Sequence, residues 1–158
     1  MIILGIDPGL ARTGYAILTT EKNEFTNIVF GCIVTPKNTA LEKRLGTIHN
    51  NLEKIIKKYK PEKVAIEQLF WGKNVKTALL VGQARGVICL AAAKNKLPVY
   101  EFTPLQVKQV LTGYGQADKN QVQQMLKAIF SLKKIPRPDD AADALAIAYC
   151  CLQNKSFT

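Results

Sequence analysis

The sequence has no long apolar run and few side chains that could form a zinc site or a disulfide framework. No stretch of its 158 residues approaches the roughly 18 consecutive apolar residues of a membrane-spanning helix. The first residues lack the basic segment of a secretory signal, so we expect a cytoplasmic protein with no membrane partner. Its four cysteines show no C-x-x-C spacing, and there is one histidine. This composition argues against a structural zinc site and favours reduced thiols.

Acidic residues are scarce as well. Only 12 Asp and Glu oppose 22 Lys and Arg, which gives a formal net charge of +10. A positive surplus of this size in a small protein favours a polyanionic partner, with nucleic acid ahead of a membrane surface. The hydrophobic content of 47% and the length are ordinary for a globular protein, so we expect one domain over residues 1–158.

The hydrophobic pattern predicts an α/β fold with a mixed five-stranded sheet. Three apolar runs joined by short links predict an antiparallel meander. Two further runs follow predicted helices, and helical crossovers would place them parallel to earlier strands. The predicted strands cover residues 2–6, 14–20, 28–34, 63–66 and 99–103.

Helices are expected between and after these strands. Apolar residues at three- and four-residue spacing predict an amphipathic helix up to Pro61, opened by a capping box of Thr39 and Glu42. A helix over 76–93 is rich in small residues; its Gly82 and Gly86 fit either packing on the sheet or a helix pair across a dimer interface. The other expected helices begin at Pro104, at an Asp118 cap with an end near Leu132, and at about Asp139.

A carboxylate ends the first apolar strand. Burying an ionised carboxylate without partners costs several kcal/mol or more, so Asp7 must lie at the strand's mouth, form a pair or hold a cation. Pro8 and Gly9 stop the strand directly after it. A simple Asp-Pro-Gly turn explains the same residues. Both interpretations stay open for this stretch alone.

Further acids occupy comparable positions. Glu67 follows the predicted strand 63–66, and Asp140 and Asp143 are three residues apart on one face of the last helix. Asp139 is a candidate N-cap for that helix. Two acids at strand ends and two on a helix face would repel one another without hard cations. Such a set fits two magnesium ions, the arrangement that hydrolyses phosphodiesters.

The segment after Glu67 places aromatic rings beside basic residues. Phe70 and Trp71 are followed closely by Lys73. Aromatic rings near a basic surface can stack on unpaired bases or insert between base steps. Packing of one ring into the core is the alternative, and we expect only one of the two to be exposed.

Five motifs together resemble the RuvC family of bacterial Holliday-junction resolvases over essentially the whole chain. The family resemblance implies a ribonuclease H-like fold with helices on both faces of a mixed five-stranded sheet. It also implies a homodimer that cuts two like-polarity strands of a four-way junction in recombination and repair, with the branch-migration proteins RuvA and RuvB as partners. The motifs are Gly5-Ile6-Asp7-Pro8-Gly9 with Thr13-Gly14-Tyr15, Ile66-Glu67-Gln68 with Phe70 and Lys73-Asn74, Gly82-Gln83-Ala84-Arg85-Gly86-Val87, Gln106-Val107-Lys108-Gln109, and Asp140-Ala141-Ala142-Asp143-Ala144-Leu145-Ala146.

The same resemblance assigns roles to individual residues. It implies a divalent cation, usually magnesium, with manganese as a possible substitute. It places the junction-stacking aromatic on Phe70. Trp71 and Asp139 depart from the family pattern, and some relatives carry His where this chain has Asp143. The implied catalytic and metal-binding acids are Asp7, Glu67, Asp140 and Asp143, and the basic residues expected to contact DNA are Lys73, Lys76, Arg85, Lys108 and Lys119.

Three other functions compete with a junction-resolving endonuclease. The Gly5–Gly9 motif followed by Thr13 and Gly14 also resembles the first phosphate loop of actin-like ATPases and sugar kinases, which need two such domains. A related ribonuclease H-like nuclease acting on another DNA or RNA substrate is the second alternative. A junction-binding protein without cleavage is the third.

Overall fold

The computed structural model describes residues 1–22, 24–68 and 75–154. They form a five-stranded sheet in the order β3-β2-β1-β4-β5. Strands β1, β2 and β3 pair antiparallel, and β4 and β5 add in parallel on the other side of β1. This is the predicted meander with two crossover strands. The strands are β1 Ile2–Asp7, β2 Arg12–Glu21, β3 Glu24–Val34, β4 Lys63–Glu67 and β5 Val99–Phe102.

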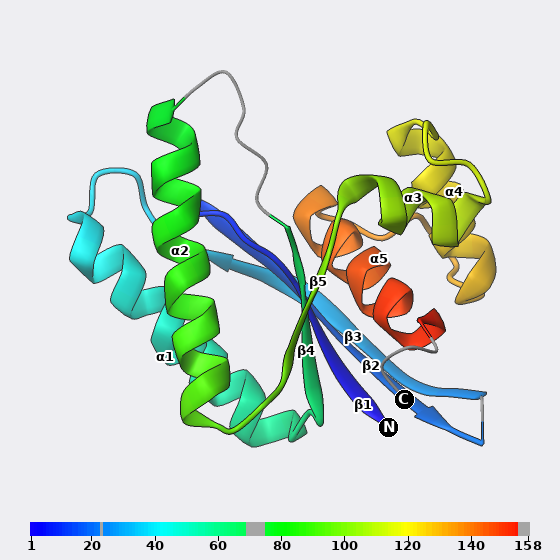
Figure 1. The fold of residues 1–158 in the computed structure, drawn as a ribbon, viewed down its shortest axis with the longest axis horizontal. Coiled ribbons are helices and arrows are strands. Elements are labelled where there is room, and N and C mark those ends of the chain that lie inside the picture. Colours follow the sequence, from blue (N-terminus) through cyan, green and yellow to red (C-terminus); the bar gives the residue numbers. More distant parts are fainter. Residues whose placement is uncertain (23, 69–74, 155–158) are drawn as a thin grey trace.

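Helices cover both faces of the sheet, as predicted (Figure 1). One face packs on α1 and α2 through a core that includes Leu4, Ile17 and Ile66. The opposite face packs on α3, α4 and α5 through Ile3, Leu18 and Phe102. Both faces of β1 are therefore buried, which explains its continuous apolar run. The helices are α1 Leu41–Tyr59, α2 Val75–Lys94, α3 Pro104–Thr112, α4 Lys119–Ile129 and α5 Asp139–Gln153.

Three details of the helix ends differ from the sequence prediction. The capping box at Thr39 is wrong, because α1 begins at Leu41 after Ala40 and has no side-chain cap. Asp139 is likewise inside α5 rather than its N-cap, which is Pro138. The helix that Asp118 caps ends at Ile129, because Ser131 turns to a positive φ of 49°. The cap itself is confirmed, since the Asp118 side chain accepts from the Gln121 N–H at 2.8 Å.

Helix α2 has an apolar outer face. Its segment Thr77–Lys94 has a mean hydropathy of 1.2, so by length and composition alone it could span a membrane, yet only 28% of it is buried here. Val75 is 70% exposed, Leu79 61% and Leu90 54%. Because these positions recur at helical spacing, α2 presents an apolar stripe to its surroundings, with Gly82 and Gly86 between Leu79 and Leu90.

Helix α5 lies directly on the backbones of β1 and β2. A Cβ atom added to Gly5 would come within 2.2 Å of the Ala144 carbonyl oxygen, and one added to Gly14 within 1.9 Å of the Asp140 carbonyl oxygen. No side chain separates helix and sheet at these two points. The spacing of α5 from the strands is therefore set by backbone contact.

Candidate active site

Asp7 and Glu67 lie side by side at the ends of adjacent strands. Strand β1 pairs in parallel with β4, and Ile6 is the partner of Ile66. The next residue in each strand is the acid. Asp7 is also the cross-strand partner of Gly14, the glycine on which α5 rests. The pairing register therefore brings the first turn of α5 to the same edge of the sheet.

Helix α5 contributes Asp140 and Asp143 to this edge. Each is turned toward a cation: Asp140 Oδ2 lies 3.8 Å from Arg12 Nη1, and Asp143 Oδ2 lies 3.8 Å from Lys119 Nζ. The four predicted acids thus come from three elements, β1, β4 and α5, and lie near one another at the strand ends.

The electrostatics of Asp7 show that these acids interact. The pKa of Asp7 is raised to about 8, chiefly by burial and then by the charges of Glu67, Asp143 and Asp140 in that order. Burial, and then Asp143, also raise the pKa of Glu67. Ionising all four acids is consequently unfavourable in the protein without a bound cation.

The chemistry of this donor set fits hard divalent cations. Carboxylate oxygens are the ligands that magnesium and manganese prefer, and positive charge would relieve the mutual repulsion. In the described ranges, no three Asp, Glu, His or Cys side chains converge tightly enough to hold one ion. Asp140 and Asp143 instead face Arg12 and Lys119. The acids would have to turn away from these cations to bind a metal together.

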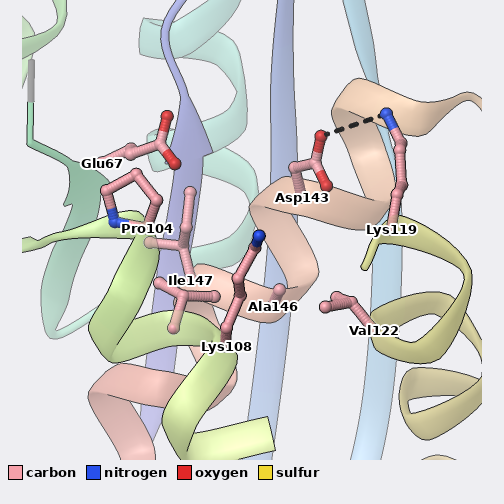
Figure 2. A pocket seen from close by; sticks show the side chains of 9 residues that line it. Glu67, Pro104, Lys108, Lys119, Val122, Asp143, Ala146 and Ile147 are labelled. Carbon is pink, nitrogen blue, oxygen red and sulfur yellow. Dashed lines mark ion pairs between the residues drawn. The ribbon is translucent and has the colours of Figure 1, made fainter. Parts of the chain in front are cut away.

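A pocket of about 190 Å³ opens beside Glu67 and Asp143, between α5 and the helices α3 and α4. Lys108 extends from α3 toward the space between these two acids, and Lys119 approaches Asp143 from α4 (Figure 2). Lys119 Nζ also contacts Asp139 Oδ2 at 2.9 Å, and this hydrogen bond raises the pKa of Lys119. Both predicted lysines therefore border the acid cluster.

The other residues that were predicted to contact DNA are either already paired or outside the part of the chain that the structure describes. Arg85 is paired with Glu101 of β5 across the sheet edge, so its charge is already compensated. Phe70 and Lys73, with the rival aromatic Trp71, lie outside the described residues. Lys76 falls in the first turn of α2, and its side chain is outside the described part.

Sequence reasoning missed two residues that contact Asp140. Arg12 pairs with Asp140, and the thiol of Cys32 lies 4.0 Å from Asp140 Oδ2. Asp139, whose role was open, accepts from Gln123 at 3.1 Å and pairs with Lys119 and Arg137. Arg12 follows the Pro8-Gly9 turn closely, which is the one signal that could have indicated it. Cys32 reaches the site only through the pairing of β3 with β2.

The raised pKa of Asp7 predicts a pH effect on stability without metal. Because the folded-state pKa of this acid exceeds the unfolded value of 3.8, ionisation disfavours the folded state. The free energy of unfolding should therefore fall as pH rises from about 4 to about 8. Between pH 5 and pH 8 the wild-type protein should lose on the order of 2 kcal/mol of its free energy of unfolding after solvent screening. Asp7→Asn should not show this loss.

Urea unfolding of both proteins in a chelating buffer measures this difference. Asp118→Asn is the matched control, because asparagine caps a helix as well as aspartate does. Equal pH dependence in wild type and Asp7→Asn would contradict the electrostatic description of the cluster.

A mixed sheet with three antiparallel strands, acids at the ends of its two central parallel strands and further acids on a covering helix defines a ribonuclease H-like nuclease. A family model for the crossover junction endodeoxyribonuclease RuvC matches residues 3–151. The chain belongs to the RuvC family of Holliday-junction resolvases, whose nucleases are metal-dependent. This assignment confirms the resemblance seen in the sequence and decides against the nucleotide-binding alternative.

Individual relatives agree over nearly full length. A RuvC crossover junction endodeoxyribonuclease of Alkaliphilus oremlandii is 55% identical over 158 residues, which is 100% of this chain and 96% of the relative. The structure of Thermus thermophilus RuvC in complex with a Holliday junction substrate superposes with a TM-score of 0.88 at 35% identity, covering 95% and 92% of the two chains. The yeast mitochondrial Holliday junction resolvase Ydc2 shares the fold, with a TM-score of 0.64 at 14% identity and coverage of 94% and 77%.

Proposed function

We propose that this protein resolves four-way DNA junctions by hydrolysing phosphodiesters with two magnesium ions held by Asp7, Glu67, Asp140 and Asp143. The meeting of these four acids at one edge of the sheet carries the proposal. When bound, such ions activate a water molecule and stabilise the charge that develops on the phosphate. Manganese is the substitute that the same oxygen donors would accept.

The chain's own residues bind and orient the substrate strand. Asp7 and Glu67 are fixed by the register of β1 and β4, and α5 is seated on Gly14 and Gly5. Lys108 and Lys119 place positive charge beside the acids, where a phosphate of the cut strand would lie. The surplus of basic residues elsewhere attracts the polyanion.

Cleavage of a synthetic mobile four-way junction in the presence of magnesium tests this function. We expect paired cuts in strands of like polarity and no comparable cutting of linear duplex or of RNA. Cutting of duplex or RNA at an equal rate would favour a related nuclease, and binding without any cutting would favour a junction-binding protein.

We also propose that residues 1–158 act as one nuclease domain in a cytoplasmic homodimer. Two equivalent cuts require two sites, which a two-fold dimer supplies. The exposed apolar stripe of α2, with Val75, Leu79 and Leu90 around Gly82 and Gly86, supports an interface there. Sedimentation velocity at micromolar concentration measures the assembly. The family resemblance supports RuvA and RuvB as partners.

The two lysines at the acid cluster should each contact a phosphate. Lys108→Ala or Lys119→Ala should weaken junction binding and make its dependence on the logarithm of salt concentration shallower by about one unit. Lys94→Ala, at the far end of α2, is the matched control. Binding titrations at several salt concentrations measure the slope. Slopes unchanged from wild type for both variants would remove this assignment.

Phe70 should position the branch point more than it adds affinity. Stacking one base on an aromatic ring contributes about 1–3 kcal/mol, similar to the cost of unstacking a step at a distorted crossover. Phe70→Ala should therefore bind junctions almost normally and cleave them roughly 10- to 100-fold more slowly. Phe70→Trp should retain much of the activity.

The neighbouring ring is the necessary comparison. Single-turnover cleavage by Trp71→Ala should stay near the wild-type rate. Loss of cleavage only in that variant would transfer the stacking role to Trp71, and loss in neither would exclude such a role for both rings.

A further inference from the structure

We propose that a second, cationic groove on the far side of Asp140 binds the sugar-phosphate backbone of the cut strand where it continues beyond the acids. This Arg44 groove has a volume of about 780 Å³ and is lined by Arg12, Lys37, Arg44, Thr77 and Asp140, among others. The inference rests on the proposed function and assigns further substrate contacts to the same site.

The groove collects positive charge from three separate segments. Arg12 opens β2, Lys37 lies in the link between β3 and α1, and Arg44 lies near the start of α1. One carboxylate, Asp140, lines the same groove. Among the described residues, no carboxylate lies within ion-pair distance of Lys37 or Arg44. Arg12 is paired with Asp140, so the uncompensated positive charge comes from Lys37 and Arg44, and it raises the local affinity for a polyanion.

The Arg44 guanidinium is held in place by a hydrogen bond to a buried residue. Its Nε donates to Thr35 Oγ1 at 2.9 Å, and Thr35 is only 2% exposed. The Thr35 hydroxyl in turn donates to the Leu10 carbonyl, and its N–H donates to the Ala11 carbonyl at 3.1 Å. Arg44 is thus tied to the link that carries Arg12. A guanidinium has five N–H donors, so the terminal nitrogens keep donors for a phosphate.

Helix stability does not explain a cation at this position. Arg44 lies close to the N-terminal end of α1, where the helix dipole favours negative charge and disfavours positive charge. The N-terminal end of α2 borders the same groove through Thr77 and Leu80. Figure 1 shows the starts of α1 and α2 at the end of the molecule where β1 and β4 terminate. These helix ends add to the positive potential.

The Arg44 groove is continuous with the acid cluster, and this identifies its ligand as a strand of nucleic acid. Arg12 and Asp140 line both the Arg44 groove and a neighbouring cleft that contains Lys119 and Arg137. Cationic side chains therefore border Asp140 on two sides. A free phosphate or a nucleotide would need one closed site. A polymer crossing the acids needs charge on both sides, as found here, with Lys108 and Lys119 on one side and the Arg44 groove on the other.

The test compares variants that each remove two charges from α1 or its approach. The groove variant is Lys37→Gln with Arg44→Gln, and the control is Lys54→Gln with Lys57→Gln, two exposed lysines farther along the same helix. In magnesium-free titrations of a synthetic four-way junction, the groove variant should bind more weakly. Its slope against the logarithm of salt concentration should be shallower by about 1.8, at about 0.9 for each phosphate contact. Because this slope counts contacts with phosphates, the control should keep the wild-type slope.

Two further variants keep the test decisive if the loss of the Thr35 hydrogen bond unfolds the protein. Lys37→Gln alone changes an exposed side chain and should lower the slope by about 0.9. Arg44→Lys keeps the charge and should keep the slope. Ethylation interference should show that the phosphates affected in wild type, but not in the groove variant, lie on one strand beside the cut.

The possible outcomes distinguish a failure of this inference from a failure of the proposed function on which it rests. Unchanged slopes in Lys37→Gln and the double variant, with a wild-type protein that binds and cleaves junctions, would overturn the Arg44 groove alone. The same would hold if the interfering phosphates were scattered over several strands. A wild-type protein that neither binds nor cleaves junctions would overturn the proposed function itself.

Discussion

Replacing Asp7 with asparagine should lower the rate of junction cleavage about a thousandfold while leaving junction binding close to that of wild type. Asp7 is the most buried acid of the cluster and the one that Glu67, Asp140 and Asp143 all influence. The amide keeps the shape of the side chain and removes the charge that would hold a cation. Losing one preorganised electrostatic contact to a transition state costs roughly 100- to 1000-fold, and a metal ligand belongs at the upper end.

Single-turnover cleavage of a mobile junction measures the rate, and titration in a chelating buffer measures binding. Glu67→Gln, Asp140→Asn and Asp143→Asn should behave like Asp7→Asn. Asp118→Asn makes the same chemical change at an aspartate outside the cluster and should cleave within a few-fold of wild type. Near-normal cleavage by Asp7→Asn would refute the assigned site.

Replacing Gly14 with alanine should both destabilise the protein and abolish cleavage. The new Cβ would lie 1.9 Å from the Asp140 carbonyl oxygen, which is backbone and cannot rotate away. The first turn of α5 must move, and Asp140 moves with it. Inserting a methyl group into a fully packed contact costs about 3 kcal/mol. Gly5→Ala, 2.2 Å from the Ala144 carbonyl oxygen, should cost about as much stability.

Gly46→Ala is the control, because a Cβ at Gly46 within α1 would meet nothing within 4 Å. It should raise the free energy of unfolding by up to about 1 kcal/mol. Chemical denaturation gives the stabilities, and cleavage at a temperature where each variant is folded gives the activity. Full activity in folded Gly14→Ala would show that Asp140 does not depend on this contact.

The strands and their acids could be predicted because short-range patterns determine them. The apolar run before Asp7 and the one before Glu67 each end in a carboxylate, and a crossover helix makes two such strands parallel. The spacing of Asp140 and Asp143 similarly indicates one helix face. Parallel strands bring their carboxyl ends to the same edge, so sequence order alone was enough to predict the cluster.

The orientation of the acids and the cations around them could not be predicted. Arg12 and Cys32 reach Asp140 only through the register of three strands, and register depends on tertiary packing. Thr39 failed as a cap because the chain turns there through a bond from its N–H to the Pro36 carbonyl, so α1 begins one residue later than a Thr39 cap requires. Arg85 has no nearby acid in the sequence, and its partner Glu101 is supplied by β5.

The position of α5 on the sheet also determines when the enzyme can form during synthesis. Asp7 lies on β1 and is synthesised well before Asp140 and Asp143, which lie on α5, the helix that covers β1 and β2 at the centre of one face. A nascent chain that ends before α5 therefore lacks two of the four acids, and this face of its sheet is uncovered. Domains fold as units once their last element is available, so nuclease activity should arise only after α5 has been translated. A prematurely terminated product would consequently be unable to cut the chromosome.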